Sequence, residues 1–215
     1  MSVCVIVGGA EIKKYDEIKK YLSADDFYIF CDCGLNHQEK LGVKPDLIVG
    51  DFDSYNRPVT DIETIVLPCE KDDTDTVFAV KEAIKRGHKD FILIGVVGGR
   101  FDHTLGNVAI LLMLENQGLN GKIIDDFSEM EIVTDKTAFV EDKFSYFSLL
   151  NITGKAEGVD IKNAKYPLTS AEIKCDYPIG VSNEVIKGKT AEITVKNGNL
   201  LLIKVRKNTN QGTVL

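Results

Sequence analysis

The sequence predicts an α/β protein, with an N-terminal doubly wound, mostly parallel sheet domain followed by a C-terminal antiparallel β-sandwich or barrel domain. Two observations predict this fold class. Up to residue 127, short apolar runs of the kind buried in a parallel sheet alternate with segments of helical periodicity. Beyond that residue the helical period disappears, and short segments recur between turn signals. We therefore place an α/β domain at residues 1–127 and a β-rich domain at residues 128–215.

The apolar runs of the first half predict buried strands at residues 3–7, 27–31, 47–50, 64–67, 91–97 and 122–125. Amphipathic spacing predicts a helix over residues 12–22. A second helix is expected over residues 74–86, where Val77, Val80 and Ile84 recur at helical spacing before Gly87 ends the helix. The stretch 104–117 is apolar on nearly all sides, which predicts a deeply packed helix.

The second half predicts shorter strands, at residues 131–134, 138–140, 146–150, 159–161, 191–195 and 200–205. Asn197-Gly198 stands between the last two segments. This pair is a strong hairpin signal, because glycine adopts the positive φ that a tight turn needs. We therefore expect the last two strands to pair with each other.

Composition and charge exclude several classes of protein. The net charge of −7 argues against a nucleic-acid partner, which needs a basic surface to neutralise phosphates. No apolar run approaches the roughly 20 residues of a membrane span, and we expect a cytoplasmic protein. The odd number of cysteines, five, fits reduced thiols better than disulfides. Cys31 and Cys33 with His37 nearby would be an incomplete zinc site, so packing is their default role.

Two acids end one of the predicted strands. Asp51 and Asp53 follow the apolar run 47–50, and residues two apart in an extended chain point the same way, about 7 Å apart. The pair predicts a site for a hard cation, with Mg²⁺ as the leading candidate. A solvated turn is the alternative reading. Repetition favours the metal, because the segments 71–75 and 98–103 also place acids at the end of an apolar run or the start of a helix. Asp72 and Asp75 are the further candidate ligands.

Phosphate-binding features accompany these acids. Gly8-Gly9 and Gly98-Gly99 follow strands, where glycine lets backbone N–H groups approach a phosphate, although a diglycine is also an ordinary turn. Arg100 offers a bidentate fork. Asp102-His103 reads either as an acid–base pair or as a helix cap, and Asp72, Asp73 or Thr74 as the cap of the helix ending near residue 86.

The common kinase phosphate loop, GxxxxGK[ST], is absent. The residues alone therefore predict an Mg²⁺-dependent enzyme that acts on a nucleotide or another phosphorylated compound.

Taken together, the motifs resemble those of the thiamine pyrophosphokinase family, in an order that covers nearly the whole chain. They are Cys31-Asp32-Cys33-Gly34-Leu35-Asn36, the segment from Pro45 to Ser54, Lys71-Asp72-Asp73-Thr74-Asp75, Gly99-Arg100-Phe101-Asp102-His103, Tyr146-Phe147-Ser148-Leu149-Leu150 and Gly180-Val181-Ser182-Asn183-Glu184. The chain departs from the family pattern at Cys33, where relatives usually have glycine. It also has no tryptophan, which some relatives stack on thiamine.

The resemblance implies transfer of the pyrophosphoryl group of ATP to the thiamine hydroxyl, with Mg²⁺ neutralising phosphate charge, and a homodimer whose sites draw on both subunits. It assigns ATP and metal binding to the first domain, and thiamine binding and dimerisation to the second. The implied catalytic residues are Asp51, Asp53, Asp75 and Asp102, and the implied metal ligands are Asp51, Asp53, Asp72 and Asp75. The implied nucleotide-binding residues are Arg100, Asp32, Gly99, His103 and Thr74, and the implied thiamine-binding residues are Ser182 and Asn183. Two rival functions are a phosphate-ester hydrolase and a regulatory nucleotide- or metal-binding module without turnover.

Overall fold

The computed structural model describes residues 2–52, 59–70 and 72–207. The chain divides between Asp126 and Phe127 into two compact units. The first unit alternates strands and helices, and the second contains only strands among its described regular elements. Both halves therefore have the fold class that the sequence predicts.

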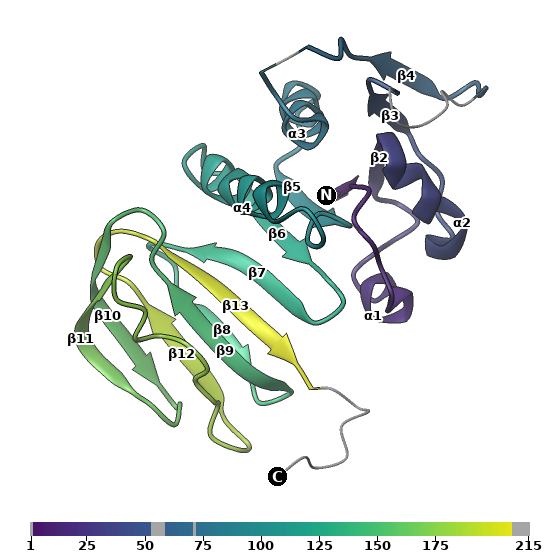
Figure 1. Cartoon of the computed structure of the whole chain (residues 1–215). Coiled ribbons are helices and arrows are strands. Elements are labelled where there is room, and N and C mark those ends of the chain that lie inside the picture. The colour runs from purple at the N-terminus through teal and green to yellow at the C-terminus, as the bar shows by residue number, and fades with distance from the viewer. Residues whose placement is uncertain (1, 53–58, 71, 208–215) are drawn as a thin grey trace. The chain divides into compact units, whose positions relative to one another are not determined.

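The first unit is built on a parallel sheet (Figure 1). Its strands are β1 (Cys4–Val7), β2 (Phe27–Cys31), β3 (Leu47–Gly50), β4 (Glu63–Val66), β5 (Asp90–Ile94) and β6 (Asn120–Ile124). They lie in the order β4-β3-β2-β1-β5-β6, and each neighbouring pair is parallel. The order reverses between β1 and β5. In sheets of this kind, ligands bind outside the carboxyl ends of the strands at such a reversal.

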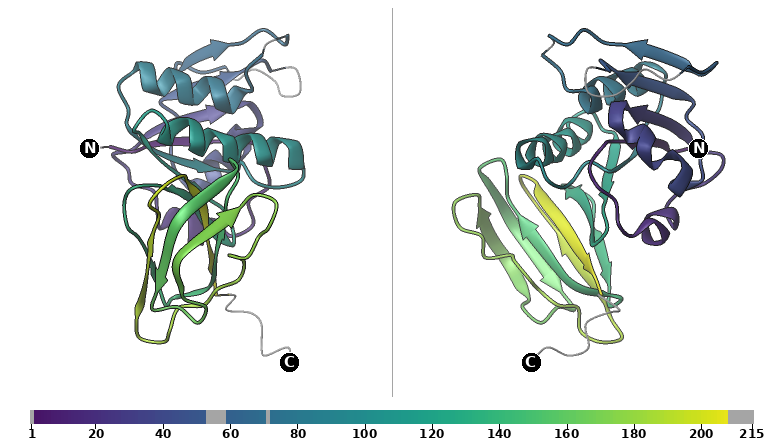
Figure 2. Two further views of the ribbon diagram at one scale, coloured as in Figure 1. Left: turned by 90° about the vertical axis from the view of Figure 1, so that its left-hand side faces the viewer. Right: turned by 45° about the vertical axis from the view of Figure 1, so that its right-hand side comes forward.

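Helices cover both faces of this sheet (Figures 1 and 2). The helices are α1 (Tyr15–Lys19), the 3₁₀ helix η1 (Asp32–His37), α2 (Gln38–Leu41), α3 (Asp75–Lys85) and α4 (Phe101–Glu115). Val5 and Val7 of β1 join a core with Ile18 of α1 and Leu41 of α2. Alternate residues of a strand point to opposite faces, so the remaining β1 side chains face α3 and α4.

Helix α3 agrees with the local sequence signals. Thr74 is its N-cap, with the hydroxyl oxygen accepting from the Val77 N–H at 3.3 Å. Gly87 follows the helix with φ of 93°, a conformation that favours glycine, and donates its N–H to the Ile84 carbonyl. Of the caps considered from sequence, Thr74 is therefore the one observed.

Two helix predictions differ from the structure. Helix α1 is much shorter than the predicted 12–22, because the N–H groups of Lys13 and Lys14 donate to the Asp126 carboxylate and hold that segment outside the helix. Helix α4 begins at Phe101, earlier than predicted. It is not deeply packed along its whole length, since Phe101 and Leu105 are 71% and 55% exposed. Its buried side chains are Asn107, Ile110, Leu111 and Leu114.

The second unit is a β-sandwich of two antiparallel sheets (Figure 2). Its strands are β7 (Ser128–Val133), β8 (Ala138–Glu141), β9 (Phe144–Leu150), β10 (Lys155–Lys162), β11 (Leu168–Lys174), β12 (Thr190–Thr194) and β13 (Leu200–Arg206). One sheet contains β7-β13-β9, and the other has the order β11-β10-β12-β8. Phe147 and Leu202 of the first sheet pack with Val159 and Ile193 of the second. Strand β11 is not among the predicted strands, because it is mostly polar and exposed and so has no apolar run.

The expected hairpin at Asn197-Gly198 is wrong. Strand β12 pairs with β10 and β8, whereas β13 pairs with β7 and β9, so this turn carries the chain from one sheet to the other. Asn197 exchanges backbone hydrogen bonds with Glu157 of β10. A side chain at Gly198, where φ is 87°, would collide with the Lys155 carbonyl oxygen at 2.5 Å. The turn is therefore selected by packing against β10 rather than by pairing of its flanking strands.

Candidate functional site

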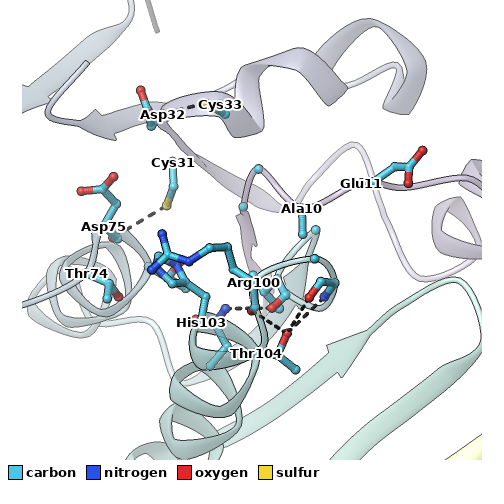
Figure 3. Close-up of a pocket in the computed structure, with 18 residues that line it drawn as sticks. Ala10, Glu11, Cys31, Asp32, Cys33, Thr74, Asp75, Arg100, His103 and Thr104 are labelled. Carbon is cyan, nitrogen blue, oxygen red and sulfur yellow. Dashed lines mark hydrogen bonds between the residues drawn. The ribbon is translucent and has the colours of Figure 1, made fainter. Parts of the chain in front are cut away.

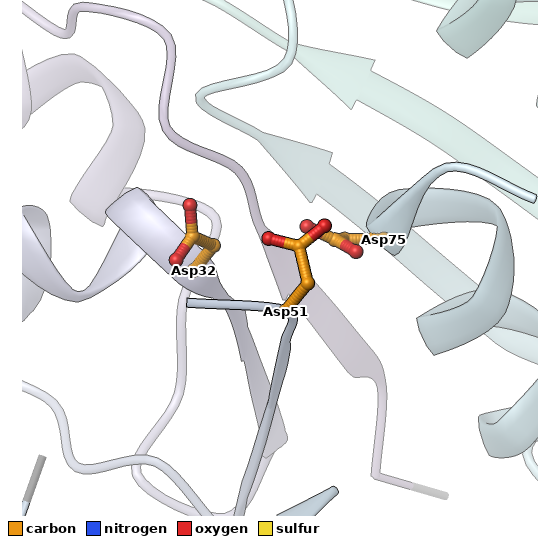
Figure 4. Close-up of side chains that lie close together, drawn as sticks. All are labelled: Asp32, Asp51 and Asp75. Atoms are coloured by element: carbon orange, nitrogen blue, oxygen red, sulfur yellow. The ribbon is translucent and has the colours of Figure 1, made fainter. Parts of the chain in front are cut away.

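Three aspartates meet at the carboxyl edge of the parallel sheet (Figure 4). Asp32 follows β2, Asp51 follows β3, and Asp75 begins α3. One carboxylate oxygen from each lies within 4.8 Å of the others. We call these three residues the carboxylate cluster. It gathers acids from three separate loops on one side of the reversal in strand order.

Local backbone geometry brings these acids together. Asp32 has φ of 40°, a conformation that is costly for a residue with a side chain and that concentrates at functional sites. Gly50 leaves room for it, because a Cβ at Gly50 would meet the Asp32 Cβ at 3.1 Å. The buried Cys31 thiol donates to the Asp75 carbonyl oxygen at 3.8 Å, which ties the end of β2 to the start of α3. Burial raises the pKa of this thiol, so it remains a neutral donor.

The donor set of the cluster fits a hard divalent cation. Carboxylate oxygens are the ligands that Mg²⁺ and Ca²⁺ prefer. Within the described parts of the chain, Oδ1 of Asp32 is buried and accepts no hydrogen bond, while its Oδ2 accepts from the Cys33 thiol at 3.3 Å. A buried carboxylate oxygen without a donor is costly, and a bound cation would satisfy it.

A cavity of about 600 Å³ adjoins the cluster (Figure 3). This volume lies in the range of small-molecule sites. Its walls come from the loops after β1 and β5, from η1, and from the first turns of α3 and α4. The predicted nucleotide-binding residues all line it, namely Asp32, Thr74, Gly99, Arg100 and His103. Asp75 of the carboxylate cluster also lines it. The cavity lies at the reversal in strand order between β1 and β5.

Arg100 and Asp102 form an exposed bidentate pair. Nε of Arg100 donates to Oδ1 of Asp102 at 3.0 Å, and Nη2 donates to Oδ2 at 2.6 Å. These bonds hold the pKa of Asp102 well below its usual range. Asp102 therefore stays ionised at neutral pH and is a weak proton acceptor. This favours a role for Asp102 in orienting Arg100 over a role as an acid–base catalyst.

Two glycines of the cavity, Gly8 and Gly98, use their N–H groups within the protein. The Gly8 N–H donates to the Ile94 carbonyl, and the Gly98 N–H donates to Oγ1 of Thr104 at 3.1 Å. A side chain at Gly8 would meet the Gly95 carbonyl oxygen at 2.5 Å. The turn reading of Gly8 and Gly98 is thus the better one, because both N–H groups are used within the protein.

Sequence reasoning did not assign Cys33, Thr104 or Asn107 to the cavity that they line. Thr104 binds the Gly98-Gly99 loop through its hydroxyl, and Nδ2 of the buried Asn107 donates to the Val96 carbonyl at 2.8 Å. The sequence signal for Thr104 and Asn107 is that they are polar residues on the first turns of an otherwise apolar helix.

Other predicted positions lie elsewhere. Asp72 is exposed and is not part of the carboxylate cluster, and Asp53 lies outside the described residues. Asp32, predicted as a nucleotide contact, lines the cavity and is also a member of the carboxylate cluster. The zinc reading is not supported, because both ring nitrogens of His37 already have partners, the Tyr15 hydroxyl and the Ala10 carbonyl.

The two thiamine-binding candidates of the second unit differ from each other. Asn183 is 4% exposed, and its side-chain oxygen accepts from the N–H groups of Tyr166 and Glu184 at 3.0 and 2.9 Å. Its amide nitrogen donates to the Tyr166 carbonyl at 2.8 Å. Ser182 is exposed, with φ of 58°, and its N–H donates to Oγ of Ser148 at 3.0 Å. Ser182 is therefore an exposed residue, whereas the side chain of Asn183 is engaged in internal hydrogen bonds.

The fold and the cavity are typical of an α/β enzyme that acts on a phosphorylated substrate. Comparison with known proteins identifies the enzyme family. The model of the thiamin pyrophosphokinase catalytic domain matches residues 18–123, and that of the thiamin pyrophosphokinase vitamin B1 binding domain matches residues 130–200. The chain belongs to the thiamin pyrophosphokinase family. It is a transferase that moves the pyrophosphoryl group of ATP to the hydroxyl of thiamine, giving thiamine diphosphate and AMP.

Relatives match over almost the full chain. Thiamine pyrophosphokinase of Bacillus subtilis (strain 168) is 24% identical over 212 residues, which are 95% of this chain and 99% of the relative. Thiamin pyrophosphokinase 1 of Caenorhabditis elegans is 21% identical, over 95% and 88%. The crystal structure of the Bacillus subtilis protein has a TM-score of 0.85 at 21% identity, covering 96% of this chain and 100% of that one. That of Geobacillus thermodenitrificans thiamin pyrophosphokinase has a TM-score of 0.82 at 25% identity, covering 97% and 100%.

No helix in the described ranges of the chain has the length and apolar composition to cross a membrane. All five cysteines are free, with Cys4 and Cys31 buried and Cys69 and Cys175 exposed.

Proposed function

We propose that the cavity binds ATP and that Asp32, Asp51 and Asp75 hold Mg²⁺ beside its phosphates. The observation that carries this proposal is the approach of the three carboxylates to within 4.8 Å at the edge of a cavity large enough for a small molecule. The cation would neutralise charge on the phosphate oxygens during transfer. The five free thiols support the cytoplasmic location that we propose for the enzyme.

The residues of the chain supply binding and orientation. Asp102 orients the guanidinium of Arg100 through Nε and Nη2, and the N–H groups that this pair leaves over bind phosphate oxygens. Thr104 holds the Gly98-Gly99 loop from which Arg100 extends. The thiamine hydroxyl attacks the β-phosphorus and releases its proton to solvent, and the bond from that phosphorus to the oxygen of the α-phosphate breaks, so that AMP leaves.

Product analysis tests the reaction. Purified protein with ATP, Mg²⁺ and thiamine should give AMP and thiamine diphosphate in equal amounts. Free phosphate in place of thiamine diphosphate would favour the hydrolase, and no turnover would favour the regulatory module.

A matched pair of variants tests the metal site. Asp51→Asn should weaken Mn²⁺ binding and should abolish turnover. Mn²⁺ binding is measured by electron paramagnetic resonance in the absence of substrates. Asp73→Asn is the control, because Asp73 is a nearby acid whose carboxylate pairs with Lys81 at 2.7 Å and lies outside the cluster. Equal Mn²⁺ affinity for both variants would remove the assignment of Asp51.

We also propose a homodimer in which thiamine bound at the second unit of one chain meets ATP bound at the first unit of the other. The distribution of candidates supports the division of labour, since the carboxylate cluster lies in the first unit and the exposed Ser182 in the second. Mixed dimers of inactive Asp51→Asn chains with inactive Ser182→Arg chains test this sharing. Arginine at residue 182 adds bulk and a positive charge that opposes cationic thiamine. With random pairing, recovered activity should approach roughly a quarter of wild type, because half the dimers are mixed and each holds one intact site. Sites confined to one chain would recover nothing.

A further inference from the structure

His37 is a buried histidine outside the carboxylate cluster. It is 6% exposed, and both ring nitrogens have a partner. Nε2 lies 3.0 Å from the backbone carbonyl oxygen of Ala10, and Nδ1 lies 2.7 Å from the hydroxyl oxygen of Tyr15. The rings of Tyr15 and His37 also contact each other, with centroids 5.9 Å apart.

These partners determine which nitrogen of His37 carries the proton. A carbonyl oxygen only accepts, so Nε2 must carry the hydrogen that is donated to Ala10. In the neutral ring Nδ1 is then an acceptor, and the Tyr15 hydroxyl donates to it. Burial lowers the pKa of His37, which favours this neutral form. The Ala10 carbonyl therefore selects this tautomer, and the Tyr15 hydroxyl stabilises it by donating to Nδ1.

Ala10 connects three walls of the nucleotide cavity. Its N–H donates to the Gly95 carbonyl at 2.8 Å, so it is bound to the loop after β5. A side chain at Gly98 would meet the Ala10 Cβ at 3.5 Å, so the backbone leading to Arg100 packs beside it. Its carbonyl is bound by His37. Movement of Ala10 would therefore displace the loop that carries Arg100.

His37 also lies on the same short helix as a member of the carboxylate cluster. Helix η1 begins with Asp32 and ends with His37. In its middle, Gly34 lies so close to the Val7 carbonyl oxygen that a side chain would collide with it. The hydrogen bond from His37 to Ala10 thus joins the helix that carries Asp32 to the loops on the Arg100 side of the cavity.

We propose that His37, whose ring is held by the Tyr15 hydroxyl at Nδ1, is a positioning residue for nucleotide binding. It holds the peptide of Ala10, so that the helix carrying Asp32 and the loop carrying Arg100 keep a constant separation across the cavity. The proposal rests on the proposed binding of ATP in this cavity. It predicts that substitution of His37 weakens the binding of ATP and leaves the binding of thiamine unchanged. Substitution of an ordinary core residue would not affect one substrate and spare the other.

The test compares substitutions that keep or remove the donor. His37→Leu fills similar space without a hydrogen-bond donor. It should raise both the Kd and the KM for ATP about tenfold and leave the KM for thiamine unchanged. His37→Gln places an amide N–H near the position of Nε2 and should restore ATP affinity to within about twofold of wild type. Tyr15→Phe removes the hydrogen-bond donor to Nδ1, so the ring that donates to Ala10 is held less firmly, and it should weaken ATP binding about threefold.

Nucleotide binding is measured apart from turnover, by calorimetry with Mg²⁺ and α,β-methylene ATP, whose bridge between the α- and β-phosphorus resists cleavage. Loss of transfer with intact binding would count against the proposed reaction and leave the positioning role standing. His88→Leu is the control for loss of a histidine, because His88 stacks on Phe27 at the amino end of β2. It should leave the affinity for the nucleotide unchanged.

Folded His37→Leu protein with wild-type nucleotide affinity would overturn the proposal. So would failure of His37→Gln to restore affinity. If His37→Leu does not fold, Tyr15→Phe decides, and wild-type affinity in that variant overturns the proposal equally.

Discussion

The carboxyl edge of the parallel sheet and the 180–184 segment of the sandwich contain similar polar residues, yet they use them differently. At the sheet edge, Asp32, Asp51 and Asp75 converge from separate loops, and Oδ1 of Asp32 is buried without a hydrogen bond within the described part of the chain. In the sandwich, the side chain of Asn183 makes hydrogen bonds on both its oxygen and its nitrogen.

The difference follows from strand direction. Parallel strands end on the same edge, so loops distant in sequence bring their polar groups to one place, where a ligand can satisfy them. In the sandwich, Asn183 lies beside β9, bridged to Phe147, and its side chain is satisfied by the neighbouring backbone. We therefore expect substitutions in the carboxylate cluster to reduce function without reducing stability, and substitution of Asn183 to do the reverse.

The largest expected effect is that of Asp32→Asn. Asparagine tolerates the positive φ at this position, so the backbone is retained while one negative charge is lost. We expect kcat/KM to fall on the order of a hundredfold or more. The free energy of unfolding without Mg²⁺ should stay equal or rise, since crowding of like charges is relieved. Steady-state kinetics and urea titration measure the two quantities, and a marked loss of stability would contradict the comparison.

Asn183→Ala should lower the free energy of unfolding by about 2 kcal/mol, because the backbone groups of Tyr166 and Glu184 lose a buried partner. The folded fraction should keep the wild-type KM for thiamine. Ser182→Ala is the matched variant, with unchanged stability and a higher KM for thiamine. A higher KM in stable, folded Asn183→Ala protein would show that Asn183 contacts thiamine and would break the comparison.

Substitution of Arg100 sharpens the comparison within the cavity. Arg100→Lys keeps the charge and loses the fork, so the KM for ATP should rise about tenfold, and Arg100→Ala should raise it further. Stability should change little, because the pair with Asp102 is exposed. Identical ATP kinetics in all three proteins would place Arg100 on the solvated surface.

The smallest expected effect is on the pH dependence of stability. Burial lowers the pKa of His37, and Lys40 lowers it further, against the raising effects of the Ala10 carbonyl and Asp126. The unfolded chain therefore binds more protons between the folded pKa and about 6.5. The stabilisation is complete above about pH 6.5 and is lost as pH falls through the folded pKa. His37→Gln should flatten this part of the profile in urea titrations at several pH values.

His88 is the control for that profile, because burial lowers its pKa as well. His88→Gln should remove a separate part of the slope, and the double variant should remove both. A profile unchanged by His37→Gln would show that His37 does not titrate differently in the folded protein.

Local sequence signals determined much of the framework. The apolar runs located all the strands of the parallel sheet, and Thr74 and Gly87 marked the ends of α3, because capping and left-handed conformations depend on neighbours within a few residues. The order of acids after apolar runs indicated a site at strand ends. The resemblance to the family, carried by short motifs, named the reaction.

Only the tertiary structure decided which of these residues meet. Asp32 joins Asp51 and Asp75, and Asp72 does not, because the strand order places β2 beside β3 and Thr74 turns α3 so that its first residue faces them. The Asn197-Gly198 turn could equally have closed a hairpin, and packing against β10 sends it between sheets instead. Such outcomes depend on contacts between residues far apart in the chain, which local patterns do not record.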